Sequence, residues 1–196
     1  MNRFRTRLHF VAAACLLGAG CINLDPRPDP TRYYDLAGKA PDSVASVNGI
    51  RIGLWPTEIP GYLNSRMIVT RGNQHRINYA EYERWAEPFP ANLDRALRNH
   101  LLGDERVESV LLGPWNKSAK PDRVVRVRLI EFEGSEDGSI RLSAQWNIED
   151  GDAAPGESTT HSTLLSGTWK AGDYSDLAEQ MSSLLKELSA GILAGQ

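Results

Sequence analysis

The chain has 196 residues, of which 41% are hydrophobic, and its formal net charge is −3 at pH 7. This length is enough for one domain with a hydrophobic core. The mildly acidic balance argues against binding to nucleic acid, because that function requires a basic face.

Residues 1–20 have the pattern of a secretory signal peptide. Arginines precede an apolar run from Leu8 to Ala19, which is shorter than the roughly 20 residues needed to cross a bilayer core. Small residues then lead to Cys21, with Leu17 four places before it, and this arrangement resembles the lipobox of bacterial lipoproteins. The resemblance implies cleavage after Gly20, a diacylglycerol thioether on Cys21 and acylation of the new amine.

Lipid on Cys21 would place the protein on a membrane of the cell envelope. Each buried CH₂ contributes about 0.8 kcal/mol, so two or three acyl chains give a stable anchor. The alternative is an ordinary exported protein in which Cys21 is free or paired. In lipoproteins of this kind, Asp after the cysteine favours the inner membrane, whereas this chain has Ile22, which favours the outer membrane and a position facing the periplasm.

Three prolines follow the cysteine at alternate positions, Pro26, Pro28 and Pro30. This spacing favours an extended, semi-rigid tether. We therefore expect a signal peptide at 1–20, a lipidated cysteine and tether at 21–31, and one folded domain at 32–196.

Strand patterns fill most of this domain. Residues 140–149 alternate apolar and polar side chains, which is typical of a strand with one face on the core. Turn signals at Gly72-Asn73 and Asp137-Gly138 predict two hairpins. The predicted strands, in chain order, are 33–36, 49–55, 66–71, 75–79, 123–133, 140–149 and 160–169.

Two segments have helical periodicity. In 89–102, Phe89, Leu93, Ala96, Leu97 and Leu101 form one apolar stripe. Residues 173–193 repeat the pattern, with Asp173 placed to cap the first turn. Because each helix has one apolar face, the fold class we expect is α+β, an antiparallel or mixed sheet with two main helices packed on one face.

Candidate catalytic groups are few. Glu131 and Glu133 lie two apart on a predicted strand and so point to the same side, where paired carboxylates could share acid and base work. The solvated end of a strand is the interpretation we favour for them. The acidic run at 149–152 lacks a full calcium loop, and no zinc-site spacing occurs. We therefore expect no enzyme and no catalytic, cofactor-binding or metal site.

Aromatic and arginine side chains gather between residues 54 and 89. Protein interfaces are enriched in both, so this stretch is the candidate partner surface. The alternative is that its large aromatic residues, among them Trp55, belong to the core. The residues that we assign to the candidate surface are Tyr62, Arg66, Arg71, Arg84 and Trp85.

The chain resembles the ABC-type transport auxiliary lipoproteins, the family that includes paraquat-inducible protein C. The matching pieces occur in the family's order and cover most of residues 32–193. They are YYDL, IGLWPTEIPGYLNSRMIVTR, ERWAEPF, EFEG, LSAQWNIED and the C-terminal YSDLAEQMSSLLKELSAGIL.

The resemblance implies a non-enzymatic accessory role beside an MCE-domain transport protein that moves phospholipids or related lipids across the periplasm. The lipoprotein would hold or receive the far end of the transporter at the outer membrane. MCE partners are ring-shaped, which leaves a homo-oligomer open. Two alternatives remain: a lipid-binding carrier with an apolar groove, and a hydrolase of envelope polymers.

Replacing Cys21→Ser should release the protein from membranes into the soluble periplasmic fraction, because the anchor depends on the acylated thiol. Fractionation of cells and immunoblotting measure the change. Retention of the variant in the membrane fraction would count against the lipid anchor.

Overall fold

A computed structural model describes residues 28–36, 48–73, 75–116, 118–151 and 158–195. The chain divides into two units, Met1–Pro30 and Thr31–Gln196, and the account below concerns the second. The predicted signal peptide and Cys21 lie outside the described residues.

The second unit is built on one mixed, eight-stranded sheet. Its helices are η1 (Gly61–Leu63), α2 (Phe89–Leu102) and α3 (Tyr174–Ala194). Its strands are β1 (Arg32–Tyr34), β2 (Ile50–Leu54), β3 (Met67–Asn73), β4 (Arg76–Trp85), β5 (Val107–Leu112), β6 (Arg123–Ser135), β7 (Ser139–Asp150) and β8 (Thr159–Thr168).

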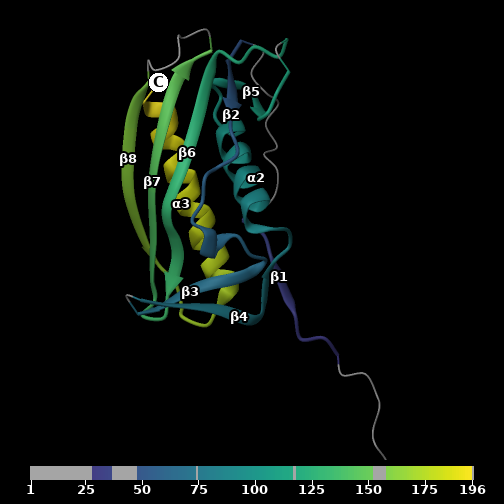
Figure 1. Cartoon of the computed structure of the whole chain (residues 1–196), viewed down its shortest axis with the longest axis vertical. Helices are drawn as coiled ribbons and strands as arrows, with labels where there is room; N and C mark the ends of the chain where they lie inside the picture. Colours follow the sequence, from purple (N-terminus) through teal and green to yellow (C-terminus); the bar gives the residue numbers. More distant parts are fainter. Residues whose placement is uncertain (1–27, 37–47, 74, 117, 152–157, 196) are drawn as a thin grey trace, which may run out of the picture. The chain divides into compact units, whose positions relative to one another are not determined.

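Strand β6 is the central strand of the sheet (Figure 1). On one side it pairs antiparallel with β7, which in turn carries β8. On its other side β6 has two parallel partners in succession. Its first residues pair with β2, and its end pairs with β3 through Thr70 opposite Gly134 and Arg71 opposite Ser135. Strand β2 carries β5, while β3 carries β4 and β1.

Two prolines explain why β2 and β3 are separate strands along the same edge of β6. Pro56 and Pro60 have no N–H group to donate to a ladder. Between them only Glu58 bridges to β6: its N–H donates to Val127 O at 3.0 Å, and its carbonyl accepts from Leu129 N at 2.8 Å. The chain then turns through η1 before β3 begins.

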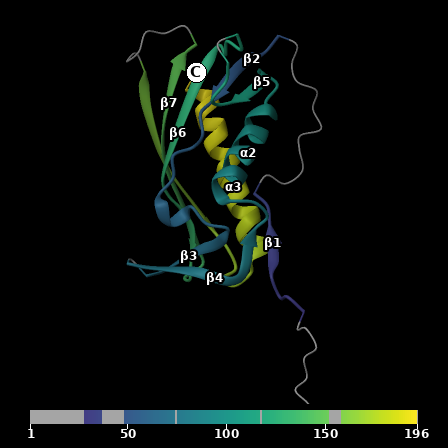
Figure 2. The ribbon, with the colours of Figure 1, turned by 45° about the vertical axis from the view of Figure 1, so that its right-hand side comes forward.

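Helices α2 and α3 cover one face of the sheet (Figure 2). The N-terminus of α3 is capped as predicted, since the Asp173 side chain accepts a hydrogen bond from Asp176 N. Among the described residues, neither helix is both long and apolar enough to cross a membrane. The expected α+β class, with both helices on one face, is confirmed.

A β-bulge in β6 changes which side chains face the helices. Val125, Val127 and Leu129 point into the core, and after the register shift beyond Leu129 the next core residue is Phe132. The inward positions therefore change from odd to even numbers, which turns Glu131 and Glu133 away from the helices. Without the bulge both carboxylates would enter the hydrophobic core.

Sequence patterns located every strand of the sheet except β5. The two predicted hairpins are formed by β3 with β4 and by β6 with β7, and β8 is the third partner in the row. Strand β1 begins at Arg32, one residue before the predicted strand 33–36, and ends at Tyr34, two residues before the predicted end. Strand β5 follows α2 after a short turn and pairs parallel with β2.

Substituting Gly134→Val should destabilise the domain by about 1–3 kcal/mol through overpacking. A Cβ atom here would lie 2.7 Å from Leu177 Cδ1 and 2.9 Å from Trp169 Nε1. The free energy of unfolding in urea measures the effect. Gly61→Ala is the matched control, because no atom lies within 4 Å of that Cβ position; equal unfolding midpoints for the two variants would contradict the packing described.

Candidate functional site

An exposed face on β1, β4 and β3 gathers aromatic, sulfur-containing and cationic side chains. Tyr33 and Met67 are both register partners of Arg84, so the three share one side of these strands. Tyr82, two residues before Arg84, points the same way. Tyr33, Tyr82 and Met67 are 60%, 43% and 36% exposed. We call these four residues the β1–β4–β3 face. Arg66, which directly precedes β3, is also exposed.

This face has the composition of a protein-binding surface. Tyr, Met and Arg are enriched in the centres of interfaces, where aromatic anchors supply most of the binding energy. The Arg84 guanidinium donates to Glu81 O at 3.3 Å, which fixes part of its position. The arrangement can therefore offer a partner an apolar surface with a positioned cation beside it.

The five residues predicted as a partner surface separate into three groups. Arg84 lies on the β1–β4–β3 face, and the exposed Arg66 directly precedes β3. Trp85 is only 2% exposed and packs in the core, with its ring centroid 5.5 Å from that of Phe89. For Trp85 the alternative interpretation, a core residue, is the one that the structure supports. Tyr62 and Arg71 meet at a third place, around a buried carboxylate.

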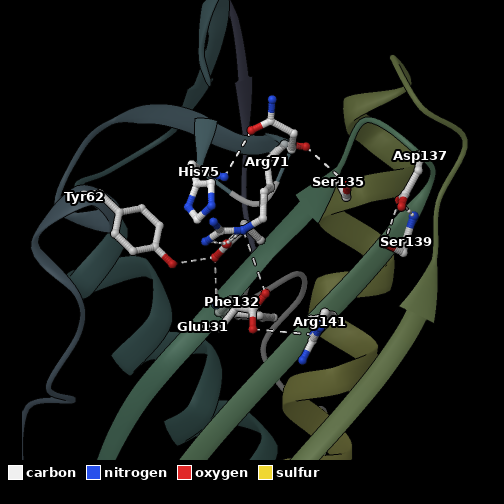
Figure 3. A network of polar contacts seen from close by, with 11 residues as sticks. Tyr62, Arg71, His75, Glu131, Phe132, Ser135, Asp137, Ser139 and Arg141 are labelled. Carbon is white, nitrogen blue, oxygen red and sulfur yellow. Dashed lines mark hydrogen bonds and ion pairs between the residues drawn. The ribbon is translucent and has the colours of Figure 1, made fainter. Parts of the chain in front are cut away.

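That carboxylate belongs to Glu133, whose side chain is 1% exposed. Arg71 donates from both Nε and Nη2 to its Oε1, the Nε contact measuring 2.7 Å. Tyr62 OH donates to Oε2 at 2.8 Å, as does Phe132 N at 3.0 Å. Figure 3 shows the Arg71 and Tyr62 side chains converging on this point from β3 and from η1. The buried charge is thus paired and fully hydrogen-bonded.

The neighbouring Glu131 forms the outer part of the same network. It lies 3.9 Å from Arg71 Nε and 3.5 Å from Arg141 Nε. The prediction that Glu131 and Glu133 point to the same side is correct. The prediction that both are solvated is wrong for Glu133, because η1 and β3 cover the end of β6. Each carboxylate faces an arginine, so the pair lacks the free acid and base that shared proton transfer requires.

Burial and hydrogen bonding also hold two tyrosines in their protonated form. Burial and the hydrogen bond to Glu133 raise the pKa of Tyr62 above its ordinary value. Burial and the bond from its hydroxyl to Glu83 Oε2, at 2.6 Å, raise the pKa of Tyr34 to about 12. Arg32 also donates to Glu83 through Nε at 3.0 Å. This second network fastens β1 to β4.

The pockets beside these networks are polar. One of about 380 Å³ lies at the end of β6 and is lined by Arg71, Glu131, Ser139 and Arg141 among others. Another of about 450 Å³ lies beside Arg32 and the 170–174 turn. A third, of about 300 Å³, lies over the strands at Arg126, Arg128 and Gln145. Charged and polar side chains dominate the lining of all three.

The acidic run predicted from 149–152 lies partly outside the described residues, and Glu149 within it pairs with Arg126 at 2.6 Å. Within the described ranges, no three His, Cys, Asp or Glu side chains are placed to hold a metal ion.

The chain belongs to the family of ABC-type transport auxiliary lipoprotein components, whose family model matches residues 34–193. This match covers the sheet from Tyr34 of β1 to the end of β8, all of α2, and α3 as far as Leu193. A comparison with curated proteins found no significant match.

Two solved structures share this fold. An uncharacterized protein superimposes with a TM-score of 0.65 at 17% identity, over 83% of this chain and 95% of its own. A Xanthomonas campestris protein of the DUF330 family also gives 0.65, at 10% identity, over 83% of this chain and 92% of its own. The match to the family model confirms the family resemblance predicted from the ordered motifs.

Replacing Glu133→Gln should cost about 3 kcal/mol of stability, because it removes the ion pair that this carboxylate, 1% exposed, makes with Arg71. Glu131→Gln should cost less than about 1 kcal/mol, since that carboxylate is partly solvated and its contacts with arginine are long. Urea unfolding followed by circular dichroism compares the two. A larger loss for Glu131→Gln would contradict the assignment of Glu133 as the network's centre.

Proposed function

We propose that this chain is a non-enzymatic docking subunit of an MCE-type intermembrane lipid transport system, anchored by lipid on Cys21 at the outer membrane and facing the periplasm. The observation that carries the proposal is the exposed β1–β4–β3 face on a domain whose interior is filled. A subunit of this kind acts by presenting a surface in a fixed place, which needs neither a catalytic group nor a cofactor.

The pockets favour docking over lipid carriage. A carrier must shield acyl chains in a large groove lined by apolar side chains. The three pockets described above are lined by arginine, carboxylate and hydroxyl groups instead. The space between helices and sheet is occupied by the side chains of a continuous core, among them Leu97, Phe132 and Leu185.

The position of the face in the chain supports a docking role at a membrane. Strand β1 begins at Arg32, directly after the predicted tether at 21–31, so Tyr33 is close in sequence to the proposed anchor. Tethering raises the effective concentration of a partner on the same surface. A contact of modest affinity would then be sufficient.

The proposed partner rests on the family, and the proposed membrane rests on one sequence feature. The family supplies the link to transport, and Ile22 after the cysteine supplies the preference for the outer membrane. An MCE-domain protein is the partner that the family resemblance implies, because these lipoproteins accompany such transporters.

Crosslinking and co-purification of the full-length protein from membranes test the proposal. Recovery of an MCE-domain protein is the expected result. Recovery of phospholipid in stoichiometric amounts, without such a partner, would support the carrier alternative and count against docking.

Tyr82→Ala and Arg84→Glu should each lower partner recovery, by about tenfold for a loss near 1.4 kcal/mol at a surface anchor. Arg128→Glu is the matched charge reversal, because Arg128 is exposed on β6 at 68% of its side-chain area and lies outside the β1–β4–β3 face. Circular dichroism confirms folding of each variant. Equal losses for Arg84→Glu and Arg128→Glu would show that net charge, and not this face, governs the interaction.

A further inference from the structure

Strand β8 is a long edge strand without the usual protection. It pairs with β7 from Thr159 to Thr168 with no register shift, and among the described strands β7 is its one partner. Its sequence, TTHSTLLSGT, contains no Lys, Arg, Asp, Glu or Pro. Edge strands normally carry charges, prolines or bulges, or stay short, because an open row of N–H and C=O groups invites pairing with another strand.

The other edges of the sheet are protected in these ways. Strand β1 has only 3 residues. Strand β5 has 6 residues, carries Glu108, and pairs with β2 through a register shift near Ile50. Among the described strands, β8 is therefore the edge best suited to accept another strand.

The hydrogen bond at the end of β8 shows which of its backbone groups face outward. Trp169 N donates to Gly138 O at 2.8 Å, and these residues continue the β7–β8 register. In an antiparallel ladder, hydrogen-bonded pairs alternate with pairs whose backbone groups point away. The even-numbered residues of β8 therefore direct their N–H and C=O groups to the open edge, where no described residue bonds to them.

These outward-directed residues form a palindrome. Leu164, which is 61% exposed, lies at the centre. Ser162 and Ser166 flank it, and Thr160 and Thr168 flank them. All five side chains also lie on the sheet face that the helices leave uncovered.

In a two-fold antiparallel contact between identical strands, residue i of one copy meets residue j of the other and residue j meets residue i. A register centred on Leu164 therefore sets each of these five side chains against one of its own kind. We infer that two copies of this chain pair antiparallel through their β8 edges, with Leu164 on the two-fold axis. The pairing sets Leu164 against Leu164, Ser162 against Ser166 and Thr160 against Thr168. Thr and Ser cross-strand pairs of this kind stabilise sheets.

The side chains on the helix-covered face also fit. In the same register, His161 of one copy lies opposite Gly167 of the other, and Thr163 lies opposite Leu165. These are the pairs in which side chains approach most closely, so a glycine opposite the histidine leaves room for its ring. His161 is already held by stacking on Trp146, with ring centroids 5.5 Å apart and an interplanar angle of 13°.

The register can be tested by disulfide formation in the full-length protein in membranes. Residues in a hydrogen-bonded antiparallel pair have Cα atoms about 5.5 Å apart, within the range of about 4.4–6.8 Å that a disulfide bridges. Leu164→Cys should therefore give a covalent homodimer on mild oxidation. The parental chain, whose cysteines are Cys15 and Cys21, provides the background lane.

Ser162→Cys is the matched control. Two copies of residue 162 would be about 14 Å apart, four residues along the ladder, so this variant alone should not crosslink. Coexpression of Ser162→Cys with Ser166→Cys should restore a dimer that contains one chain of each kind. Homodimers of Ser162→Cys as abundant as those of Leu164→Cys would overturn the proposal, because they would indicate random collision.

A second variant removes the contact without a new thiol. Leu164→Lys places a charge on the open edge, where it faces solvent in the single chain and its own copy in the pair. Chemical crosslinking of surface amines should give a dimer for the parental chain and none for Leu164→Lys. Circular dichroism should show that the variant keeps its fold. A dimer that persists in this variant, or a Leu164→Cys product with the mass of a different protein, would overturn the inference.

Discussion

The buried Glu133 carboxylate is the constraint that determines where strands β3, β4 and β1 lie against β6. Strand β3 contacts β6 through only two register pairs, Thr70 with Gly134 and Arg71 with Ser135. Arg71 and Tyr62 both bind Glu133 beside this short ladder. Because an unpaired charge in this position would be costly, the network holds β3, and with it β4 and β1, at a defined place against β6.

The β6 bulge makes that network possible. It turns Glu131 and Glu133 from the helix-covered side to the side where Arg71 arrives. The same bulge leaves the large Phe132 ring in the core, with its centroid 6.2 Å from that of Phe89. The extra residue in β6 therefore places the charged cluster and the apolar core on opposite sides of the same strand.

Because the helices cover one face of the sheet, the other face and the edge strands are available for binding. The β1–β4–β3 face presents two tyrosines, a methionine and an arginine, which suit a heterologous protein partner. Strand β8 presents backbone groups with a symmetric set of small and aliphatic side chains, which suit a second copy. The two surfaces lie on different strands at different edges of the sheet, so one contact does not have to exclude the other. This division agrees with the docking role proposed above.

The sequence by itself determined the elements with a strong local pattern: both long helices, the two hairpins and the alternating strand 140–149. Local periodicity and turn residues depend only on residues close together in the chain, so they can be recognised without knowing the tertiary contacts. Strand β5, which has a mixed pattern around Glu108, forms because β2 supplies a parallel partner far away in the chain. The tertiary structure alone decided that Trp85 is buried, that Glu133 is enclosed by Arg71 and Tyr62, and which tyrosines stay exposed. Burial depends on what distant segments place over a residue, and no local pattern contains that information.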